Sequence, residues 1–288
     1  MAIVDVILPI KDRDTVVVVV STLIREIRVL DGVALGQIIL CDGGSVEAVC
    51  LQQLETVSRW DDVRVLDCSY SDISEQAFNK GRLINEGLLE ATAEVVLISD
   101  VDILWTADVL QAIALAAANH AERIYSVLKV KESKTDAVAA RRQRYTYQIE
   151  KSETGIRVEV CAAAVCEAGR PGCGIVCAQR QVFERVGGYK GCFVGWGWED
   201  QDFLIRAQLF GYEVLALGEV VHLSHGDERR GMIGESVEVS RDRNIVRCLT
   251  ELKNQQLLGD LAEYSLAAGG SVLDGRQISV QYPPELGI

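Results

Sequence analysis

Residues 95–102 read Val-Val-Leu-Ile-Ser-Asp-Val-Asp, an apolar run that ends on two carboxylates separated by one residue. An apolar run of this length, bounded by polar residues, fits a strand buried on both faces of a parallel sheet. Ligands bind at the carboxyl ends of strands in open α/β sheets, so Asp100 and Asp102 would face a crevice. Two carboxylates there can hold a divalent cation against a phosphate. The alternative is a cap for the helix expected after Thr106, although one carboxylate would suffice for that purpose.

Apolar patterns in the first half of the chain alternate between strand and helix. The expected strands are residues 3–8, 37–41, 63–66, 94–99 and 123–128. The expected helices are residues 15–30, a segment that begins near Val46 after a capping turn at 42–45, and residues 76–91 and 107–119. Strands that alternate with helices predict a parallel, doubly wound sheet.

The second half of the chain is less regular. Residues 129–144 are charged and are expected to form an excursion or an exposed helix. The other expected elements are one arm of an antiparallel ribbon at 156–164, helices at 179–186, 199–210 and 235–257, and strands at 212–217 and 219–222. Since no repeat or linker is visible, we expect one domain, residues 1–257. A C-terminal extension, residues 258–288, would pack on it or be partly mobile.

The composition argues against several classes of partner. The 288 residues are within the range of a single α/β domain, and the hydrophobic fraction of 49% is ample for a core. The net charge of −13 argues against nucleic acid and anionic membranes, because both favour a basic surface. One basic cluster, residues 141–144, precedes Tyr145 and Tyr147. A solvated helix face is the favoured explanation, and a loop that faces a phosphate or an acceptor is the alternative.

The cysteines and the apolar runs indicate a cytoplasmic protein. Nine cysteines are scattered without a Cys-X-X-Cys pair, which favours free thiols in a reducing compartment over a zinc site. The apolar runs at 2–10 and 16–20 are too short for a signal peptide or a membrane span. We therefore expect no integral membrane segment, and at most peripheral attachment at the inner face of a membrane.

The segment Gly195-Trp196-Gly197-Trp198-Glu199-Asp200-Gln201-Asp202 combines glycines, tryptophans and three acids. Tryptophan can stack on a sugar ring and donate a hydrogen bond from its indole nitrogen. Acids in the first turn of a helix also complement the helix dipole. The dipole explains the acids but not the glycines and tryptophans before them, so the pattern favours a sugar-binding site.

Two of the three histidines lie within the segment His222-Leu223-Ser224-His225, which follows an expected strand. Histidine is a frequent ligand of transition metals, whereas a lone histidine is more often structural. A spacing of three residues does not place both side chains on one face of a strand. Both can bind one metal only if the backbone turns at Leu223 and Ser224. No Gly-X-Gly-X-X-Gly or phosphate-binding loop is present, so a nucleotide would have to be held through a metal.

Four motifs occur in the order seen in GT-A-fold glycosyltransferases: residues 78–87 (Phe-Asn-Lys-Gly-Arg-Leu-Ile-Asn-Glu-Gly), 99–102, 195–202 and 222–225. The pattern most resembles the β-1,4-galactosyltransferase group and the galactosyltransferase-like modules of bacterial polysaccharide synthases. Residues 38–45 resemble the Asp-Gly-Ser element of family 2 glycosyltransferases. The resemblance covers about residues 3–226. It implies a Rossmann-like, mostly parallel central sheet flanked by helices, with a small antiparallel ribbon and a C-terminal helical extension.

The resemblance also implies roles for matching residues. Nucleotide and donor-sugar binding would fall to Pro9, Lys11, Arg13, Asp42, Phe78, Lys80, Asp100, Trp196 and Gly197. Asp102 and His225 would bind the metal, joined by His222, which stands where relatives carry methionine or another ligand. Glu199 would bind sugar hydroxyls, and Asp200 would be the general base.

Two departures from the family pattern leave the donor sugar open. Trp198 replaces a glycine that is usual in the animal enzymes, and Pro171-Gly172-Cys173 differs from their donor-selecting region. The expected donor is therefore a UDP-sugar of the Gal, GalNAc, Glc or GlcNAc type.

The expected reaction is an inverting, metal-dependent transfer of that sugar to a hydroxyl of a glycan or small-molecule acceptor. Mixed carboxylate and imidazole ligands favour Mn²⁺, with Mg²⁺ as the alternative. Three other functions stay open: a retaining transferase, a catalytically silent nucleotide-sugar-binding relative, and a nucleotidyltransferase. The last usually has a glycine-rich loop near the first strand, and residues 5–14 lack glycine.

Overall fold

The computed structural model describes residues 1–69, 78–134, 143–163, 169–226, 234–261, 273 and 276–286. The strands are β1 (Ala2–Ile10), β2 (Val33–Asp42), β3 (Val63–Asp67), β4 (Val95–Ile98), β5 (Ile103–Leu104), β6 (Arg123–Glu132), β7 (Arg144–Lys151), β8 (Gly155–Ala163), β9 (Arg170–Gln179), β10 (Glu213–His222) and β11 (Gln277–Gln281). The helices are α1 (Val16–Arg28), α2 (Ala48–Val57), α3 (Lys80–Glu90), α4 (Ala107–Asn119), α5 (Arg180–Val186), α6 (Glu199–Leu209), α7 (Val237–Lys253) and the short 3-10 helix η5 (Pro284–Leu286).

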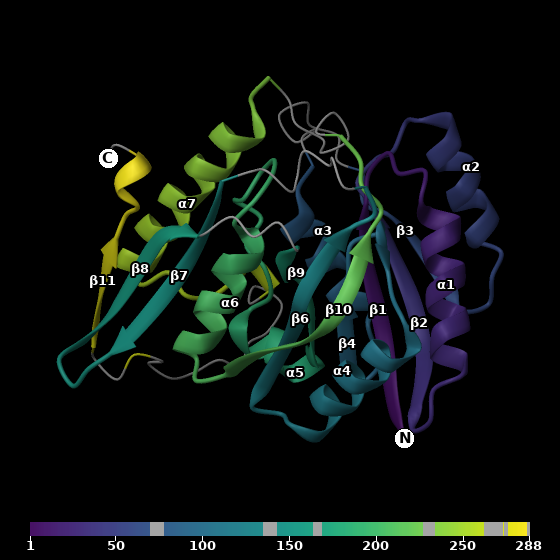
Figure 1. The fold of residues 1–288 in the computed structure, drawn as a ribbon, viewed down its shortest axis with the longest axis horizontal. Helices are drawn as coiled ribbons and strands as arrows, with labels where there is room; N and C mark the ends of the chain where they lie inside the picture. The colour runs from purple at the N-terminus through teal and green to yellow at the C-terminus, as the bar shows by residue number, and fades with distance from the viewer. Residues whose placement is uncertain are drawn as a thin grey trace.

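The central sheet has eight strands in the order β3-β2-β1-β4-β9-β6-β10-β5. The four strands β3, β2, β1 and β4 are parallel, and β6 is parallel to β10. Strand β9 runs antiparallel to both of its neighbours, and β5 runs antiparallel to β10. The predicted α/β fold with a mostly parallel sheet is therefore confirmed (Figure 1).

Helices cover both faces of this sheet because its strands are apolar on both sides. Along β1, Val4, Val6 and Leu8 pack into one core cluster with residues of α1, α2 and α4. Ile7, which points to the opposite face, packs into a second cluster with residues of α3, α5 and α6. This alternation follows the two-residue period of a strand. Burial on both faces is what the continuous apolar run predicts for a parallel sheet.

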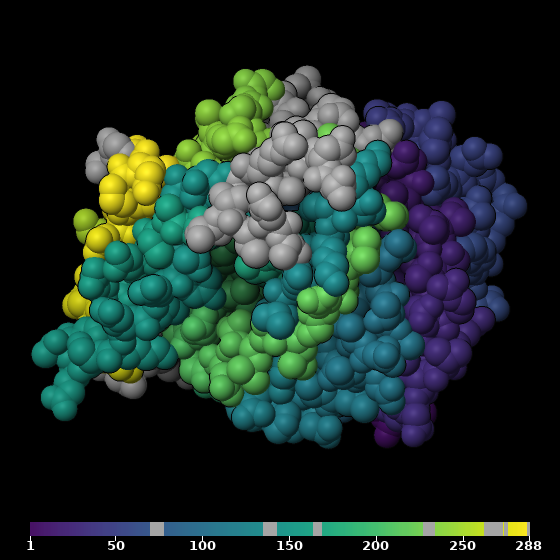
Figure 2. Space-filling view, viewed as in Figure 1, coloured from purple at the N-terminus to yellow at the C-terminus, as the bar shows by residue number. Residues whose placement is uncertain are grey.

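A second sheet, in the order β11-β8-β7, packs against α7 and α6 through a third apolar cluster. Strands β7 and β8 are antiparallel, which confirms the predicted ribbon arm as far as residue 163, where the described segment ends. Figures 1 and 2 show this sheet at one end of the molecule, with α1 and α2 at the opposite end. Among the helices that the structure describes, none combines the length and the apolar character needed to span a bilayer.

The carboxyl ends of β1, β4 and β10 meet at one edge of the central sheet. The chain that leaves β4 passes through Asp100 and Asp102 and then forms β5, which pairs with the last two residues of β10. The backbone N–H of Leu223 donates a hydrogen bond of 2.7 Å to the carbonyl of Asp102. These bonds hold the end of β4 beside the end of β10, although the two segments are far apart in sequence.

Several local predictions differ from the structure. Helix α2 begins at Ala48 rather than near Val46, and the turn at 42–45 does not cap it. Instead, one carboxylate oxygen of Asp12 accepts hydrogen bonds from the backbone N–H groups of Val46 and Glu47. The charged stretch from Lys129 begins as a continuation of β6 to Glu132, because pairing with β10 continues along it. The predicted excursion ends at Arg144, which is instead the first residue of β7. Residues 135–142 of that prediction lie outside the described residues.

Three further differences concern strands. The segments 212–217 and 219–222 form a single strand, β10, because its pairing with β6 continues on both sides of Gly218. Strand β9 was not predicted, since the glycines and the proline at its start resemble a turn. Of the extension, the structure describes residues 258–261, 273 and 276–286, and the last of these segments holds β11 and η5 rather than a longer helix. The boundary at residue 257 stays a prediction.

Candidate active site

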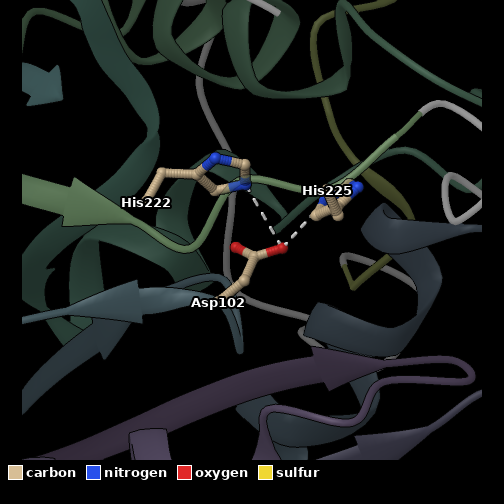
Figure 3. Close-up of side chains that lie close together, drawn as sticks. All are labelled: Asp102, His222 and His225. Atoms are coloured by element: carbon tan, nitrogen blue, oxygen red, sulfur yellow. Dashed lines mark hydrogen bonds and ion pairs between the residues drawn. The ribbon is translucent and has the colours of Figure 1, made fainter. Parts of the chain in front are cut away.

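Asp102, His222 and His225 come together where β4 and β10 end. The carboxylate atom Oδ2 of Asp102 lies 3.4 Å from Nε2 of His222 and 3.1 Å from Nε2 of His225. Figure 3 shows both rings directed toward this carboxylate. Strand β10 ends at His222, and the turn through Leu223 and Ser224 brings His225 to the same side. The backbone turn that a shared site requires is therefore present.

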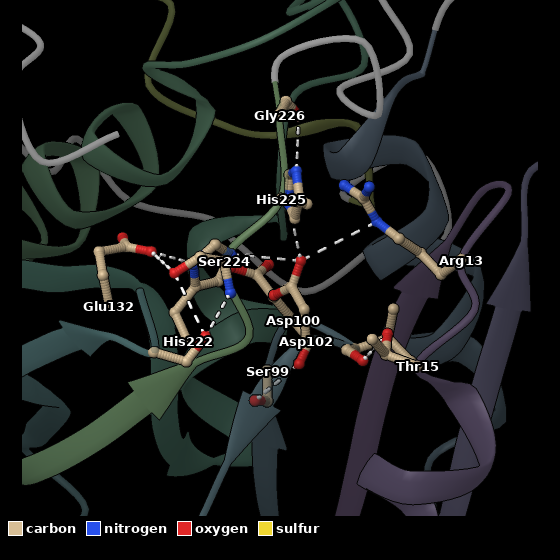
Figure 4. A network of polar contacts seen from close by, with 12 residues as sticks. Arg13, Thr15, Ser99, Asp100, Asp102, Glu132, His222, Ser224, His225 and Gly226 are labelled. Atoms are coloured by element: carbon tan, nitrogen blue, oxygen red, sulfur yellow. Dashed lines mark hydrogen bonds and ion pairs between the residues drawn. The ribbon is translucent and has the colours of Figure 1, made fainter. Parts of the chain in front are cut away.

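The other ring nitrogen of each histidine is held by an acceptor (Figure 4). Nδ1 of His222 lies 2.6 Å from Oε2 of Glu132, and Nδ1 of His225 lies 2.8 Å from the carbonyl oxygen of Gly226. Because a carboxylate and a carbonyl only accept hydrogen bonds, each Nδ1 carries a hydrogen. A neutral ring would then direct the lone pair of Nε2 at Asp102.

This arrangement brings together two ring nitrogens and one carboxylate oxygen. All three have lone pairs, so a cation or a proton must lie between them. The ligand atoms of the three residues all lie within 4.8 Å of one another. The second oxygen of Asp102, Oδ1, is buried and has no hydrogen-bond partner among the described residues. Two imidazole nitrogens and a carboxylate suit Mn²⁺ better than Mg²⁺, which prefers oxygen ligands alone. The donor set therefore fits a divalent transition metal.

The charges around this cluster keep the carboxylates of Asp102 and Glu132 ionised. Burial raises the pKa of Asp102, but hydrogen bonds from the two histidines and the nearby charge of Arg13 hold it well below its usual value. Glu132 is also partly desolvated, yet its hydrogen bond from His222 lowers its pKa to about 2. Burial lowers the pKa of His222, and the bonds to Asp102 and Glu132 outweigh this and raise it to about 9. Without a metal, His222 is therefore an imidazolium.

A second cluster lies around Lys80, the first residue of α3. Its Nζ atom lies 2.9 Å from Oδ1 of Asp100 and 3.1 Å from Oδ2 of Asp200. Lys80 thus connects the end of β4 to the first turn of α6. The other oxygen of Asp200, Oδ1, is buried and has no hydrogen-bond partner among the described residues. One carboxylate oxygen of Asp200 is therefore fixed, and the other is available to accept a proton.

Glycine at position 174 allows this cluster to form. A Cβ atom at Gly174 would lie 2.7 Å from Oδ2 of Asp200 and 2.9 Å from Nζ of Lys80, closer than side-chain contacts allow. The carbonyl of Gly174 also accepts a hydrogen bond of 3.3 Å from Lys80. Strand β9 therefore approaches the cluster through backbone alone.

Burial and crowding make the two acids of α6 harder to ionise. Burial raises the pKa of Glu199 to about 8, and the neighbouring charge of Asp200 adds to this effect. Burial also raises the pKa of Asp200, although the ammonium group of Lys80 opposes the shift. Lys80 itself is buried, which lowers its pKa, but Asp100, Asp200 and Glu199 outweigh this and raise it well above its usual value.

The turn that leads into α6 has a left-handed backbone at three positions. The φ angles of Gly195, Gly197 and Trp198 are +85°, +93° and +79°. This conformation suits glycine and is unusual for a bulky residue. The position at which Trp198 departs from the family pattern is therefore one where glycine would be the ordinary residue. The turn is held by α7, since Asn244 donates a hydrogen bond of 2.8 Å to the carbonyl of Gly197.

Both clusters line one pocket of about 410 Å³. Every predicted site residue except Asp42 contributes to its lining: Pro9, Lys11, Arg13, Phe78, Lys80, Asp100, Asp102, Trp196, Gly197, Glu199, Asp200, His222 and His225. Asp42 lies at the end of β2, where its carboxylate accepts a hydrogen bond of 2.6 Å from the Ser45 hydroxyl. The structure thus brings together the predicted residues from four separate motifs and leaves Asp42 outside the lining.

Some residues of the site were not predicted from the sequence. No local motif marks these residues, which are Glu132, Gly174, Arg170 and Arg241. Glu132 orients His222 from β6, and Arg241 reaches the pocket from α7. The only sequence signal was at 171–173, next to Gly174, where the chain departs from the family pattern.

Comparisons with known proteins identify the family and the fold of the chain. A family model described as glycosyltransferase-like family 2 matches residues 5–227. No curated protein sequence matches the chain significantly.

Several solved structures share the fold. A mannosyltransferase from Pyrobaculum calidifontis, in complex with GDP-Man and Mn²⁺, has a TM-score of 0.52 at 15% identity, over 93% of this chain and 76% of that one. GalNAc-T7 with UDP, GalNAc and Mn²⁺ has a TM-score of 0.57 at 13% identity, over 86% of this chain. The match spans 48% of the length of GalNAc-T7. TarS from S. aureus, residues 1–349 with UDP-GlcNAc, has a TM-score of 0.53 at 14% identity, over 87% of this chain and 66% of that one. At these identities the similarity establishes the fold alone, which is the GT-A fold.

Proposed function

The chain belongs to glycosyltransferase-like family 2, and from this premise we propose that it is a metal-dependent, inverting transferase that uses a UDP-sugar. The sugar would be of the Gal, GalNAc, Glc or GlcNAc type, and the acceptor a hydroxyl of a glycan or small molecule. One observation carries the proposal: two buried carboxylate oxygens, Oδ1 of Asp102 and Oδ1 of Asp200, have no hydrogen-bond partner within the described ranges, and both residues line the same pocket.

The residues around Asp102 provide the site for the metal and the diphosphate. Asp102, His222 and His225 would hold Mn²⁺, which as a Lewis acid stabilises the negative charge on a departing nucleoside diphosphate. Nε of Arg13 lies 3.9 Å from Oδ2 of Asp102, and Lys11 lines the same pocket. These cations would bind the phosphate oxygens of the donor. Glu132 acts on the metal site indirectly, by orienting His222.

Asp200 provides the proton acceptor. Lys80 fixes one oxygen of its carboxylate, and the other oxygen takes the proton of the acceptor hydroxyl. The hydroxyl oxygen then bonds to the anomeric carbon, while the bond from that carbon to the diphosphate oxygen breaks and its electron pair leaves with the nucleoside diphosphate. Attack from the face opposite the leaving group inverts the anomeric configuration. A positioned base typically contributes about 10²–10⁴-fold in rate.

The bound ligands of the structural neighbours support a nucleotide-sugar donor and Mn²⁺. The mannosyltransferase was solved with GDP-Man and Mn²⁺, and GalNAc-T7 with UDP, GalNAc and Mn²⁺. TarS was solved with UDP-GlcNAc. UDP is favoured here because the motifs most resemble the β-1,4-galactosyltransferase group.

Two substitutions test the proposal. In Asp200→Asn, the metal site is untouched but the proton acceptor is lost, so we expect UDP and Mn²⁺ to bind normally and transfer to fall by at least about 10²-fold. In Asp102→Ala, we expect calorimetry to show no Mn²⁺-dependent binding of UDP. Transfer is measured as UDP release from a panel of UDP-sugars with Mn²⁺, and the anomeric configuration of the product tests inversion.

Asp108→Asn serves as a control for both variants, because Asp108 lies in the first turn of α4 and does not line the pocket. Near-normal turnover of Asp200→Asn would contradict the role of Asp200. Unchanged UDP binding by Asp102→Ala would contradict the metal site. A product with retained configuration would contradict inversion.

A further inference from the structure

One face of α7 contacts the loop that leads into α6, residues 192–197. This loop contributes Gly195, Trp196 and Gly197 to the lining of the pocket. Side chains of α7 donate hydrogen bonds to backbone carbonyls of the loop, those of Cys192, Val194 and Gly197. The donors are Ser240, Arg243, Asn244 and Arg247. Positions spaced by three and four residues lie on one face of a helix, so these donors form a single stripe along α7.

The carbonyl of Val194 accepts more of these bonds than any other carbonyl of the described loop. It accepts a hydrogen bond of 2.8 Å from Nη2 of Arg243, and bonds of 3.4 Å from the Ser240 hydroxyl and from Nδ2 of Asn244. The same Nδ2 atom donates a bond of 2.8 Å to the carbonyl of Gly197. Because an amide group has two N–H hydrogens, Asn244 can hold the loop at both points.

The hydroxyl of Ser240 fixes the backbone between those two points. It accepts a hydrogen bond of 3.0 Å from the backbone N–H of Trp196 and donates its own hydrogen to the carbonyl of Val194. Nη2 of Arg243 donates a further bond of 3.3 Å to this hydroxyl. A hydroxyl has one hydrogen and two lone pairs, so these three bonds use the whole group. The backbone of Trp196 is therefore held by α7.

The burial of these side chains is explained by the loop. Ser240 and Asn244 are 0% and 1% exposed, although serine and asparagine are mostly exposed residues. A buried polar group lowers stability unless it is hydrogen-bonded. Ile245 and Leu249 on the same helix are apolar and pack into the third cluster. Helix α7 thus has buried polar side chains where they bind the backbone of the loop.

Gly195 lets the loop approach α7 this closely. A Cβ atom at this position would lie 2.5 Å from Oγ of Ser240, closer than side-chain contacts allow. The backbone N–H of Gly195 donates a hydrogen bond of 3.0 Å to the carbonyl of Phe78, which precedes α3 and also lines the pocket. The loop is therefore held by α7 and by the segment before α3. Because these bonds come from the chain itself, they hold the loop with or without a donor.

We propose that Ser240 and Asn244 are positioning residues for Trp196, and that α7 holds the loop in its sugar-binding conformation before the donor binds. The inference rests on the proposed function, in which Trp196 contacts the donor sugar, and specifies how that contact is prepared. Neither Ser240 nor Asn244 lines the pocket, so both act on the sugar through the loop. A loop that is ordered in advance loses little conformational freedom when the sugar binds, which favours affinity.

Amide hydrogen exchange tests whether the loop is formed in advance. It is followed by mass spectrometry of a peptide that covers residues 192–198. We expect this peptide to be protected in the protein alone, and its exchange rate to change by less than about twofold when UDP and Mn²⁺ are added. Ser240→Ala and Asn244→Ala each remove bonds to the loop, so each should speed its exchange at least about tenfold. Unchanged exchange in β1 and β4 shows that the variants are folded.

Calorimetry in the presence of Mn²⁺ tests whether the loop acts on the sugar. The probes are UDP and the UDP-linked forms of Gal, GalNAc, Glc and GlcNAc. In Asn244→Ala, we expect the affinity for each UDP-sugar that the unsubstituted protein binds to fall about tenfold, and the affinity for UDP to stay unchanged. Thr250→Ala is the matched control, because the hydroxyl of Thr250 lies on the same helix and donates to the carbonyl of Val246. This control should exchange and bind as the unsubstituted protein does.

A loop that exchanges fast in the protein alone and becomes protected with UDP and Mn²⁺ would overturn the inference, because the donor would then order it. Unchanged exchange in both variants would overturn it as well. So would equal losses of UDP and UDP-sugar affinity in Asn244→Ala, or no loss of either. Failure of the proposed function has a different result, since the unsubstituted protein would then bind neither UDP nor a UDP-sugar with Mn²⁺.

Discussion

Two buried acids of the site behave in opposite ways because their neighbours differ. Burial raises the pKa of both Asp102 and Glu199. Asp102 is flanked by two histidines and Arg13, which overcome the cost of burial and keep it ionised. Glu199 lies beside Asp200 and shares the single ammonium group of Lys80, so its pKa stays at about 8. A buried carboxyl group is thus ionised in one place and mostly neutral near pH 7 in the other.

Glu199 should make the stability of the protein depend on pH. Between its ordinary pKa of 4.5 and its folded value of about 8, the folded state holds a proton that the unfolded state has released. Stability is therefore highest below this window and falls as pH rises through it, by at most about 1.4 kcal/mol per pH unit. Glu199→Gln removes this titration, so the variant should gain stability relative to the unsubstituted protein as pH rises from 5 to 8.

Urea unfolding at several pH values, without metal or nucleotide, measures this difference. The titratable groups that face Glu199 are Asp200, Lys80 and Asp100, and all three are retained in the variant. Glu153→Gln, at an exposed turn between β7 and β8, is the surface control. A constant difference between Glu199→Gln and the unsubstituted protein across this pH range would contradict the prediction.

At the scale of elements, the turn before α6 places Trp198 in an unfavourable backbone conformation but buries its side chain favourably. Trp198 has a left-handed backbone, yet its side chain is 3% exposed and packs with β8 and α7. A bulky residue with positive φ costs about 1–3 kcal/mol. Removing a buried tryptophan side chain costs about 3–5 kcal/mol. Packing therefore outweighs the backbone cost, which explains how tryptophan is tolerated here.

Trp198→Gly should for this reason destabilise the protein, by about 2 kcal/mol, although glycine suits the backbone better. The measurement is urea unfolding followed by circular dichroism. Gln255→Gly is the matched control, because Gln255 also has a positive φ, of +60°, but its side chain is exposed. That variant should be as stable as the unsubstituted protein or more stable by up to about 1 kcal/mol. Stabilisation by Trp198→Gly would show that the backbone cost dominates.

At the scale of the whole molecule, the proposed metal site connects the two halves of the fold. Asp102 follows β4, whereas His222 and His225 lie at the end of β10. A ligand that binds only the folded chain stabilises it by about 2.7 kcal/mol at a concentration of one hundred times its dissociation constant. For a chain of this size, we expect Mn²⁺ at that level to raise the melting temperature by roughly 5 °C.

Thermal unfolding with and without Mn²⁺ measures this shift. Asp102→Ala should abolish it, and Asp108→Asn, which leaves the pocket unchanged, should keep it. An equal shift in Asp102→Ala and the unsubstituted protein would place the metal elsewhere.

The sequence by itself determined much of the local structure. Helix α4 has the predicted bounds, because a polar residue, Thr106, precedes a continuous apolar period. The short helix α5 ends at Val186 as predicted, because the next residue, Gly187, has a left-handed backbone. The placement of Asp100 and Asp102 after a buried strand also followed from the apolar run at 95–98. These features depend on neighbours within a few residues, which the sequence displays directly.

The tertiary structure decided which of these features meet. The pairs Lys80 and Asp200, His222 and Glu132, and Asp102 and His225 are separated by 120, 90 and 123 residues. The family resemblance grouped several of these residues, but no local pattern places Glu132 behind His222 or Arg241 against Tyr145. Strand β9 shows the same limit, since its direction is set by the two strands beside it. Periodicity records which face of an element is buried, whereas contacts across the sheet depend on the order of its strands.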